Sequence, residues 1–328
     1  MIGKSSQSIH RCIKLLVFVF LVGLAAPVKT QSIGNAPAYI FTYFKKNGED
    51  GLHLTYSYDG LKWNALNKDS AVLTPKVGED KLMRDPCAIK GPDGLFHMVW
   101  TVSWKERGIG YASSPDMIHW SEQQFIPVMA HEPLAQNCWA PEIIYNKVDN
   151  NYMIYWATTI PGRFPETDQK GEKNHRIYYV TTRDFKTYTK ASLLYEPGFN
   201  VIDATIQQDG NRYVMFLKNE TKKPVTEKNI RVAFSKYLTK DYSKASEPIT
   251  GKYWAEGPTA VKIDNQWVVY FDKYTDHQYG AVESADLKNW TDVSNQLKLP
   301  EGIRHGTVFA VSKPELDLLI RHFNQANK

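Results

Sequence analysis

The sequence predicts an all-β fold, a five-bladed β-propeller, and two observations carry this prediction. The first is a high density of short strand-like runs separated by turn residues, with few segments of helical period. Examples are YIFTYF (39–44), LFHMVWTVSW (95–104), NYMIYWATT (151–159) and QWVVYFDKY (266–274). The second is a pair of short motifs that alternate along the chain, the first of which returns at intervals of 49 to 64 residues.

One motif begins the first strand of each repeat, and we call it the opener. Its copies are MRDPCAI (83–89), NCWAPEII (137–144), NVIDATI (200–206), YWAEGPTAV (253–261) and IRHGTVFAV (303–311). The other motif, the closer, combines a small polar residue, an Asp and a later aromatic residue. Its copies are SYDGLKW (57–63), SPDMIHW (114–120), TRDFKTY (182–188), SADLKNW (284–290) and the degraded SKYLTKDYS (235–243). Five openers and five closers predict five blades.

The ends of the chain are predicted to close the ring. The last opener has no strands of its own after it, and the first closer has no opener before it. Strands from 39–66 therefore complete the blade that 304–312 begins, which leaves no unpaired sheet edge. The remaining segment PELDLLIRHF (314–323) is expected to form a short amphipathic helix outside this blade. The sequence therefore predicts one domain, a propeller over 32–328.

The first 31 residues are predicted to be a signal peptide. Basic residues in MIGKSSQSIHRCIK (1–14) precede the apolar run LLVFVFLVGLAA (15–26), which is short for a permanent membrane span. We expect cleavage between Ala26 and Ser32, with an uncleaved anchor as the alternative. No later segment is apolar enough to cross a bilayer, so we expect a secreted or periplasmic protein without membrane insertion.

Composition and missing motifs exclude several functions. The net charge of +5 is spread over mixed acidic and basic residues without a basic stripe, so we expect no nucleic-acid partner. No HExxH, P-loop or Rossmann glycine pattern occurs, which leaves metalloprotease, nucleotide and dinucleotide chemistry without support. Once a signal peptide is removed, Cys87 and Cys138 remain, and we expect two buried thiols rather than a disulfide.

Charged residues head the openers. In a propeller the first strand of each blade lines the central axis, so these residues converge although they are far apart in sequence. Several carboxylates gathered at one place repel one another and lower the stability of the fold. We therefore expect that a function requires them. The converging residues are Arg84, Asp85, Trp139, Glu142, Asp203, Glu256, Arg304 and His305.

The five openers, in this order and at this spacing, resemble those of glycoside hydrolase family 43. The resemblance extends over residues 38–313 and rests on MRDPCAI, CWAPEII, VIDATI, AEGPTAV and RHGTVFAV. It implies a five-bladed propeller and an inverting enzyme that acts on arabinosides, xylosides and related sugars. Within the family the sequence looks most like the branch that acts on furanosides.

The resemblance assigns the catalytic roles. Asp85 matches the general base, Glu256 the general acid, and Asp203 the carboxylate that orients and tunes the acid. Inversion needs two carboxyl groups roughly 6.5–9.5 Å apart, one to activate water and one to protonate the leaving oxygen. We expect Asp203 to raise the pKa of Glu256 by like-charge repulsion, and Arg84 to help keep Asp85 ionised.

Five residues are expected to bind substrate: Arg84, Trp139, Arg163, Arg304 and His305. Trp139 is either a platform for a sugar or a core ring. Arg163 lies in a long segment rich in turn residues, which is either a loop at the pocket rim or a solvated loop. His305 resembles the family's axial histidine, which in some members ligates a central calcium; its alternative is an interior histidine.

Three further residues receive structural predictions. Glu142 is expected to be structural or to lie at the pocket edge, and Trp104 and Trp156 are expected to pack in the core. No cofactor is expected to be required, and calcium near His305 is left open.

The predicted function is an exported, inverting exo-glycosidase that removes terminal α-L-arabinofuranosyl residues from oligosaccharide or polysaccharide side chains. The exo mode is inferred from the segment 160–175, which could wall off one end of the funnel. β-D-Galactofuranosidase and β-D-xylosidase activities are the alternatives within the family. A glycan-binding propeller without activity and a glycan phosphorylase are alternatives of other classes. The related invertase and levanase family is disfavoured because the sequence contains no Asn-Asp-Pro tripeptide.

Overall fold

The structure of the protein is a computed structural model that describes residues 37–325. The predicted signal peptide, 1–31, lies outside the described residues. Almost all regular structure is β-strand, arranged as five separate antiparallel sheets.

Four of the sheets follow one another along the chain. The first contains β4 (Arg84–Lys90), β5 (Phe96–Thr101), β6 (Ile109–Ser114) and β7 (Gln124–Ile126). The second contains β8 (Trp139–Asn146), β9 (Asn151–Thr159), β10 (His175–Thr182) and β11 (Ser192–Tyr195). The third contains β12 (Val201–Asp209), β13 (Arg212–Asn219) and β14 (Asn229–Ser235). The fourth contains β15 (Glu256–Ile263), β16 (Gln266–Lys273), β17 (Gln278–Ser284) and β18 (Thr291–Asp292).

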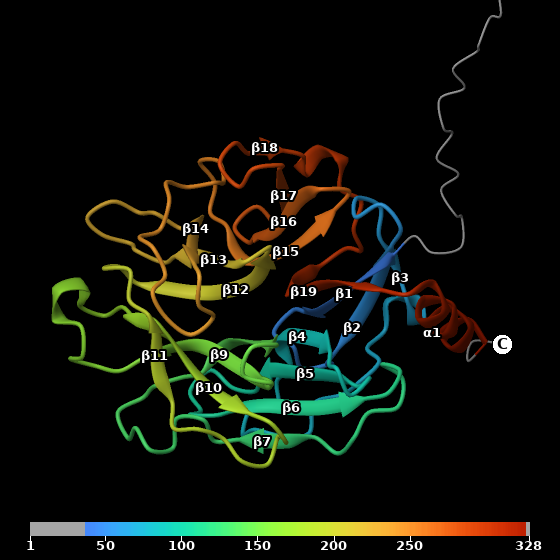
Figure 1. The fold of residues 1–328 in the computed structure, drawn as a ribbon, viewed down its shortest axis with the longest axis horizontal. Helices are drawn as coiled ribbons and strands as arrows, with labels where there is room; N and C mark the ends of the chain where they lie inside the picture. Colours follow the sequence, from blue (N-terminus) through green and yellow to red (C-terminus); the bar gives the residue numbers. More distant parts are fainter. Residues whose placement is uncertain (1–36, 326–328) are drawn as a thin grey trace, which may run out of the picture. The chain divides into compact units, whose positions relative to one another are not determined.

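The fifth sheet joins strands from the two ends of the described chain. It contains β19 (Ile303–Val311), β1 (Ala38–Lys45), β2 (His53–Ser57) and β3 (Asn64–Ala65). β19 and β1 pair from Ala38 opposite Val311 to Lys45 opposite Ile303. The inner strands β4, β8, β12, β15 and β19 contact one another in this cyclic order, while β7 and β18 lie at the periphery of Figure 1. The predicted five-bladed propeller and its closure by the chain ends are confirmed.

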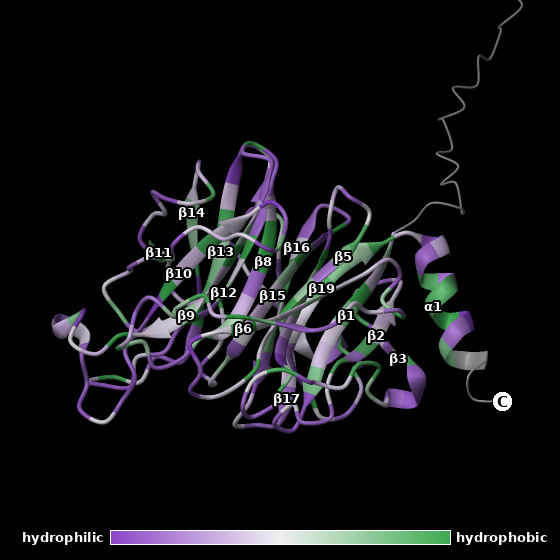
Figure 2. Cartoon of the chain, turned by 90° about the horizontal axis from the view of Figure 1, so that it is seen from below, coloured by the Kyte–Doolittle hydropathy of each residue, from purple (hydrophilic) through white to green (hydrophobic). Residues whose placement is uncertain are grey.

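The core lies between neighbouring blades. β9 shows the consequence for sequence, because eight of its nine residues, NYMIYWATT, are buried. A strand covered on both faces has no solvent side and therefore reads as a continuous apolar and aromatic run rather than an alternation. In Figure 2 the hydrophobic residues are concentrated along the strands, and the connecting loops are mostly hydrophilic.

The closers form the turns that follow the third strand of a blade. In the first, the Ser57 hydroxyl accepts a hydrogen bond from Gly60 N–H at 2.8 Å, and Asp59 Oδ1 accepts from Leu61 N–H at 2.8 Å. The closers at 114–120, 182–188 and 284–290 repeat these bonds. In the degraded copy Tyr237 takes the place of the Asp, and this blade is the three-stranded one. A lost Asp therefore coincides with a lost fourth strand.

The predicted C-terminal helix is present as α1 (Lys313–Gln325). It buries Leu316, Leu319 and Phe323, which lie on one face at helical spacing. These side chains belong to one hydrophobic cluster with residues of β1 and β2 and of the β4–β7 blade. Short 3-10 turns occupy Asn67–Asp69, Pro165–Thr167 and Ser294–Gln296 (η1 to η3).

Candidate active site

A pocket of about 500 Å³ opens at the heads of the inner strands, and we call it the axial pocket. Seven of the eight predicted catalytic and substrate-binding residues line it, although they come from all five blades. They are Arg84, Asp85, Trp139, Asp203, Glu256, Arg304 and His305.

A shared irregularity of the inner strands aims these side chains. In β4, β8, β12 and β15 the pairing register shifts within the opener, which forms a bulge. In each of these strands the residue just after the last paired position before the shift has a positive φ, between 46° and 57°; these residues are Asp85, Ala140, Asp203 and Gly257. Asp tolerates this conformation better than most residues do. Gly257 is needed because a Cβ at this position would lie 2.4 Å from the ring of His305.

Asp85 is held as a carboxylate. His305 Nδ1 lies 3.2 Å from its Oδ1, and the Thr101 hydroxyl donates to its Oδ2 at 2.8 Å. Burial alone would raise the pKa of Asp85, but the hydrogen bond and charge of His305, with smaller effects of Arg84 and Thr101, lower this pKa to about 2. Burial likewise opposes the charge on His305, yet Asp85 and more distant carboxylates raise the pKa of His305 to about 9. Arg84 therefore helps Asp85 as expected, but His305 has the larger effect.

Glu256 lies in a different environment. Lys218 Nζ is 2.9 Å from one of its oxygens, and Arg304 Nη2 is 3.0 Å from the other. Burial would raise the pKa of Glu256, but the charge and hydrogen bond of Lys218, followed by the charge of Arg304, lower it below its ordinary value. The prediction of a raised pKa for Glu256 is therefore wrong, because two cations favour its carboxylate form.

The carboxyl group with the raised pKa is that of Asp203. Burial raises the pKa of this carboxyl to about 6, even though the charges of His305 and Lys218 act in the opposite direction. Its Oδ2 accepts a hydrogen bond from Gly257 N–H at 3.0 Å, which places it beside the backbone of Glu256. The axial pocket therefore contains carboxyl groups with very different tendencies to hold a proton, which is the arrangement acid–base chemistry requires.

Two residues of second strands were missed by the sequence analysis. Lys218 is the residue before the last in β13 and lies opposite Ile202, and Asp272 lies in β16 opposite Glu256. Asp272 Oδ2 is 2.5 Å from Arg304 Nε, so Arg304 is shared between Asp272 and Glu256. Each ends an apolar run with a charged residue, and that signal could have identified them.

Two tryptophans beside β4 and β8 line the axial pocket and meet edge to face. Trp139 lines it, which favours the sugar platform over the core ring among its two predicted places. Trp104 also lines it and is 41% exposed, so its predicted core position is wrong. The reason is that β5 ends at Thr101, and Trp104 lies in the loop beyond it. Trp156 is buried, as predicted.

The structure places Arg163 outside the axial pocket, where it pairs with Glu132 at 2.6 Å. The structure therefore favours the solvated loop over the loop at the pocket rim as the environment of Arg163. The segment 160–175 nevertheless contacts a residue of the axial pocket, because Lys173 Nζ lies 4.3 Å from the ring centre of Trp139.

Glu142 lies buried below the axial pocket rather than in it. The hydroxyls of Thr205 and Thr307 donate to it at 2.9 and 3.3 Å. Burial raises its pKa to about 7 although His305 and these hydroxyls favour the charged form. Its predicted structural role agrees with this position, since its oxygens are used by neighbouring inner strands.

The two cysteines are free and buried, as predicted. In residues 37–325, no group of three or more His, Cys, Asp or Glu side chains is arranged to hold a metal ion. His305, when protonated and paired with Asp85, has no lone pair to offer a cation. Calcium near His305 stays a prediction from the sequence. None of the helices in the described part of the chain is long and apolar enough to span a membrane.

The chain is similar to known glycosyl hydrolases. A family described as "Probable glycosyl hydrolase domain", related to glycosyl hydrolase family 43, matches residues 35–317. An α-L-arabinofuranosidase of Bifidobacterium longum is 25% identical over 249 residues, which cover 64% of this chain and 23% of that protein. The chain thus spans about a quarter of the length of this relative.

Two solved structures share the fold. An α-L-arabinofuranosidase from Lactobacillus brevis aligns with a TM-score of 0.52 at 18% identity, over 65% of this chain and 72% of that one. A thermostable family-43 glycoside hydrolase aligns with a TM-score of 0.52 at 15% identity, over 70% and 82% of the two chains. At these identities the structures establish the propeller alone.

Proposed function

The chain belongs to the family of glycosyl hydrolase domains related to family 43, and on this premise we propose that it is an inverting exo-glycosidase. Its proposed action is the removal of terminal α-L-arabinofuranosyl residues from oligosaccharide or polysaccharide side chains. One observation carries the proposal: the axial pocket holds an ionised Asp85 on β4, and Glu256 with Asp203 on β15 and β12. The inner strand β19 separates β4 from β15, so the two groups approach the pocket from different sides.

The proposed reaction uses Asp85 as the base. Its carboxylate accepts a proton from a water molecule as the water oxygen bonds to the anomeric carbon. The bond from that carbon to the leaving oxygen breaks on the opposite face, and Glu256 transfers its proton to the leaving oxygen. A base with a pKa near 2 is ionised at any physiological pH, and His305 holds it in one orientation.

The cations around Glu256 have a defined part in this reaction. Lys218 and Arg304 favour its carboxylate form, so they stabilise the charge that appears as the proton leaves. The same interaction lowers the fraction of free enzyme in which Glu256 is protonated. Burial of the pocket by a bound glycan opposes this effect, since burial raises the pKa of a carboxyl group.

The choice of sugar rests on the relatives. The similar proteins from B. longum and L. brevis are both α-L-arabinofuranosidases. β-D-Galactofuranosyl and β-D-xylosyl residues remain the alternatives within the family. Export by the predicted signal peptide, without a required cofactor, completes the proposal. Mass spectrometry of the protein recovered from its host would test cleavage between Ala26 and Ser32, and activity in EDTA would test independence from calcium.

The first experiment is hydrolysis of 4-nitrophenyl α-L-arabinofuranoside, β-D-galactofuranoside and β-D-xylopyranoside, with Asp85→Asn as control. We expect release from the arabinofuranoside and a loss of about 10³-fold in the variant, a size typical of a missing general base. NMR of the first sugar released should show an inverted anomeric centre. A fully active Asp85→Asn protein would refute the assignment of the base, and glycan binding without any turnover would favour a binding propeller.

A further inference from the structure

The positive charges in and around the axial pocket form two groups, which differ in whether they pair with a carboxylate. On the side formed by β13, β15 and β19, each cation contacts a carboxylate. The pairs are Lys218 with Glu256 and Glu220, Lys222 with Glu172, Lys228 with Glu220, and Arg304 with Glu256 and Asp272. On this side the cations are therefore neutralised within the protein.

The second group, which we call the aromatic wall, lies beside β4 and β8 and consists of Arg84, Trp104, Trp139 and Lys173. The first three line the pocket, and Lys173 adjoins it through Trp139. The Arg84 guanidinium lies 4.3 Å from the ring centre of Trp104, and Lys173 Nζ lies 4.3 Å from that of Trp139. The two indole rings meet edge to face at 5.4 Å. Among residues 37–325, neither Arg84 nor Lys173 forms an ion pair.

The wall is built to stay in place. Asn47 Oδ1 accepts hydrogen bonds from both Arg84 Nη1 at 3.0 Å and Trp104 Nε1 at 3.1 Å. Trp139 Nε1 donates to the backbone oxygen of Trp104 at 3.2 Å. The guanidinium has five N–H donors, and the bond to Asn47 uses one of them. Arg84 therefore presents unused donors from a fixed position at the pocket.

Further positive charge gathers near this wall. Burial and the charge of Lys105 lower the pKa of Lys173. Lys46 is exposed and lines the same pocket. Like charges held close together destabilise a fold, and a bound anion removes that cost.

We propose that the aromatic wall binds an anionic group of the glycan, a carboxylate or a sulfate ester on a sugar adjacent to the one removed. This inference rests on the proposed function, since it places the charged sugar beside the acid–base groups. The indole rings offer apolar contact to the sugar, while Arg84 and Lys173 pair with its charge. The cations of the first group are already paired with protein carboxylates, so the charge selectivity belongs to the aromatic wall.

The test compares arabinofuranosyl oligosaccharides that differ in one neighbouring sugar: a uronic acid, its carboxyl-reduced neutral form, or a sulfated form of the neutral sugar. We expect kcat/KM at low salt to be about fivefold higher for the acidic forms than for the neutral form. The ratio should fall toward one in 0.5 M NaCl, because salt screens charges near the surface. A uronate preference without a sulfate preference would identify the carboxylate as the group bound.

Lys173→Gln should reduce the acidic-to-neutral ratio about threefold. The matched control is Lys240→Gln, because Lys240 also lies over an aromatic ring, that of Tyr237 at 4.8 Å, but at an outer turn. This control should keep the ratio of the unchanged protein. Equal rates for acidic and neutral substrates at low salt would overturn the proposal.

Binding to the Asp85→Asn protein separates this inference from the proposed function. Calorimetry with the acidic and neutral oligosaccharides needs no turnover, and we expect tighter binding of the acidic forms. Charge-selective binding without hydrolysis by the unchanged protein would refute the glycosidase and support the wall. Hydrolysis with equal affinity for all three oligosaccharides would support the glycosidase and refute the anion site at the aromatic wall.

Discussion

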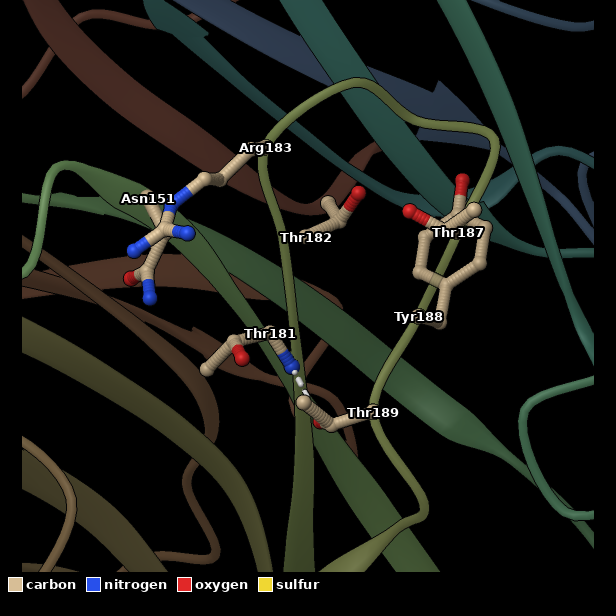
Figure 3. A pocket seen from close by; sticks show the side chains of 7 residues that line it. All are labelled: Asn151, Thr181, Thr182, Arg183, Thr187, Tyr188 and Thr189. Atoms are coloured by element: carbon tan, nitrogen blue, oxygen red, sulfur yellow. Dashed lines mark hydrogen bonds between the residues drawn. The ribbon is translucent and has the colours of Figure 1, made fainter.

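Two hollows of similar size on this molecule differ in the chemistry of their lining residues. The axial pocket has a volume of about 500 Å³, and a second hollow of about 430 Å³ lies at the turn between β10 and β11. Figure 3 shows the side chains of this outer hollow, in which Thr181 N–H donates to the Thr189 hydroxyl at 2.8 Å. Its lining residues are Asn151, Thr181, Thr182, Arg183, Thr187, Tyr188 and Thr189, none of which is acidic.

The difference shows that chemistry, rather than volume, distinguishes a reaction site. Six of the seven residues that line the outer hollow belong to one turn, 181–189, and the seventh, Asn151, begins the neighbouring strand β9. The axial pocket combines residues from five blades, and its carboxyl groups range from a pKa near 2 at Asp85 to about 6 at Asp203. Such a spread needs several charged partners held apart by a rigid frame, which the bulged inner strands supply.

The largest effect should come from Glu256→Gln. We expect kcat/KM on natural glycosidic linkages to fall about 10³-fold, because the leaving oxygen loses its proton donor. On 4-nitrophenyl glycosides the loss should be smaller, since nitrophenolate leaves with little protonation. An equal loss on both substrates would argue against Glu256 as the acid, and circular dichroism would show that folding is unchanged.

A matched pair of variants should shift the pH profile in opposite directions. Lys218→Met removes a cation from Glu256, so its pKa rises and the alkaline limb of kcat/KM should move up by about one unit. Asp272→Asn leaves Arg304 to Glu256 alone, which lowers that pKa and should move the limb down. The measurement is kcat/KM between pH 4 and 9. Shifts of the same sign would contradict this account of the acid.

The free energy of unfolding should fall as pH rises from 5 to 8, and Glu142→Gln should weaken this dependence. The folded pKa of Glu142, about 7, lies above its ordinary 4.5, so its contribution is complete below pH 4.5 and is lost as pH rises through 7. Asp203 and His305 act in the same sense, through about 6 and about 9. The single substitution should reduce the loss between pH 5 and 8 by about 2 kcal/mol, measured by urea unfolding. An unchanged slope would refute the raised pKa.

The smallest effect should come from the outer hollow. Tyr188→Phe removes a buried hydroxyl that has no hydrogen-bond partner in the structure, so stability should change little or rise slightly. We expect kcat/KM to stay within about twofold of the unchanged protein. A large loss of activity would mean that the outer hollow takes part in substrate binding, and the contrast between the two hollows would disappear.

The sequence predicted those features of the molecule that depend on residues close together in the chain. The openers gave the blade count and seven pocket residues, because each opener carries its own bulge and side-chain direction. Lys218 and Asp272 were missed because their role depends on cross-strand register, which sets them opposite Ile202 and Glu256. The same register explains the wrong prediction for the pKa of Glu256, since a pKa depends on neighbours in space.

The loop residues were harder still. Trp104 and Arg163 lie beyond the ends of strands, where no period relates sequence to position. The structure places the first in the axial pocket and the second at an ion pair with Glu132. A residue that follows a buried strand by two or three positions therefore cannot be assigned to the core from its hydrophobicity alone.

The pairing of β1 with β19 has a consequence for biosynthesis. Residues 38–45 leave the ribosome early, but their partner strand, 303–311, emerges some 260 residues later. Until then β1 lacks one of its neighbours, and the ring stays open with apolar edges exposed. Contacts between residues so distant in sequence form slowly. We therefore expect the other four blades to assemble during translation and the closing blade to assemble last, which makes it the step most exposed to aggregation.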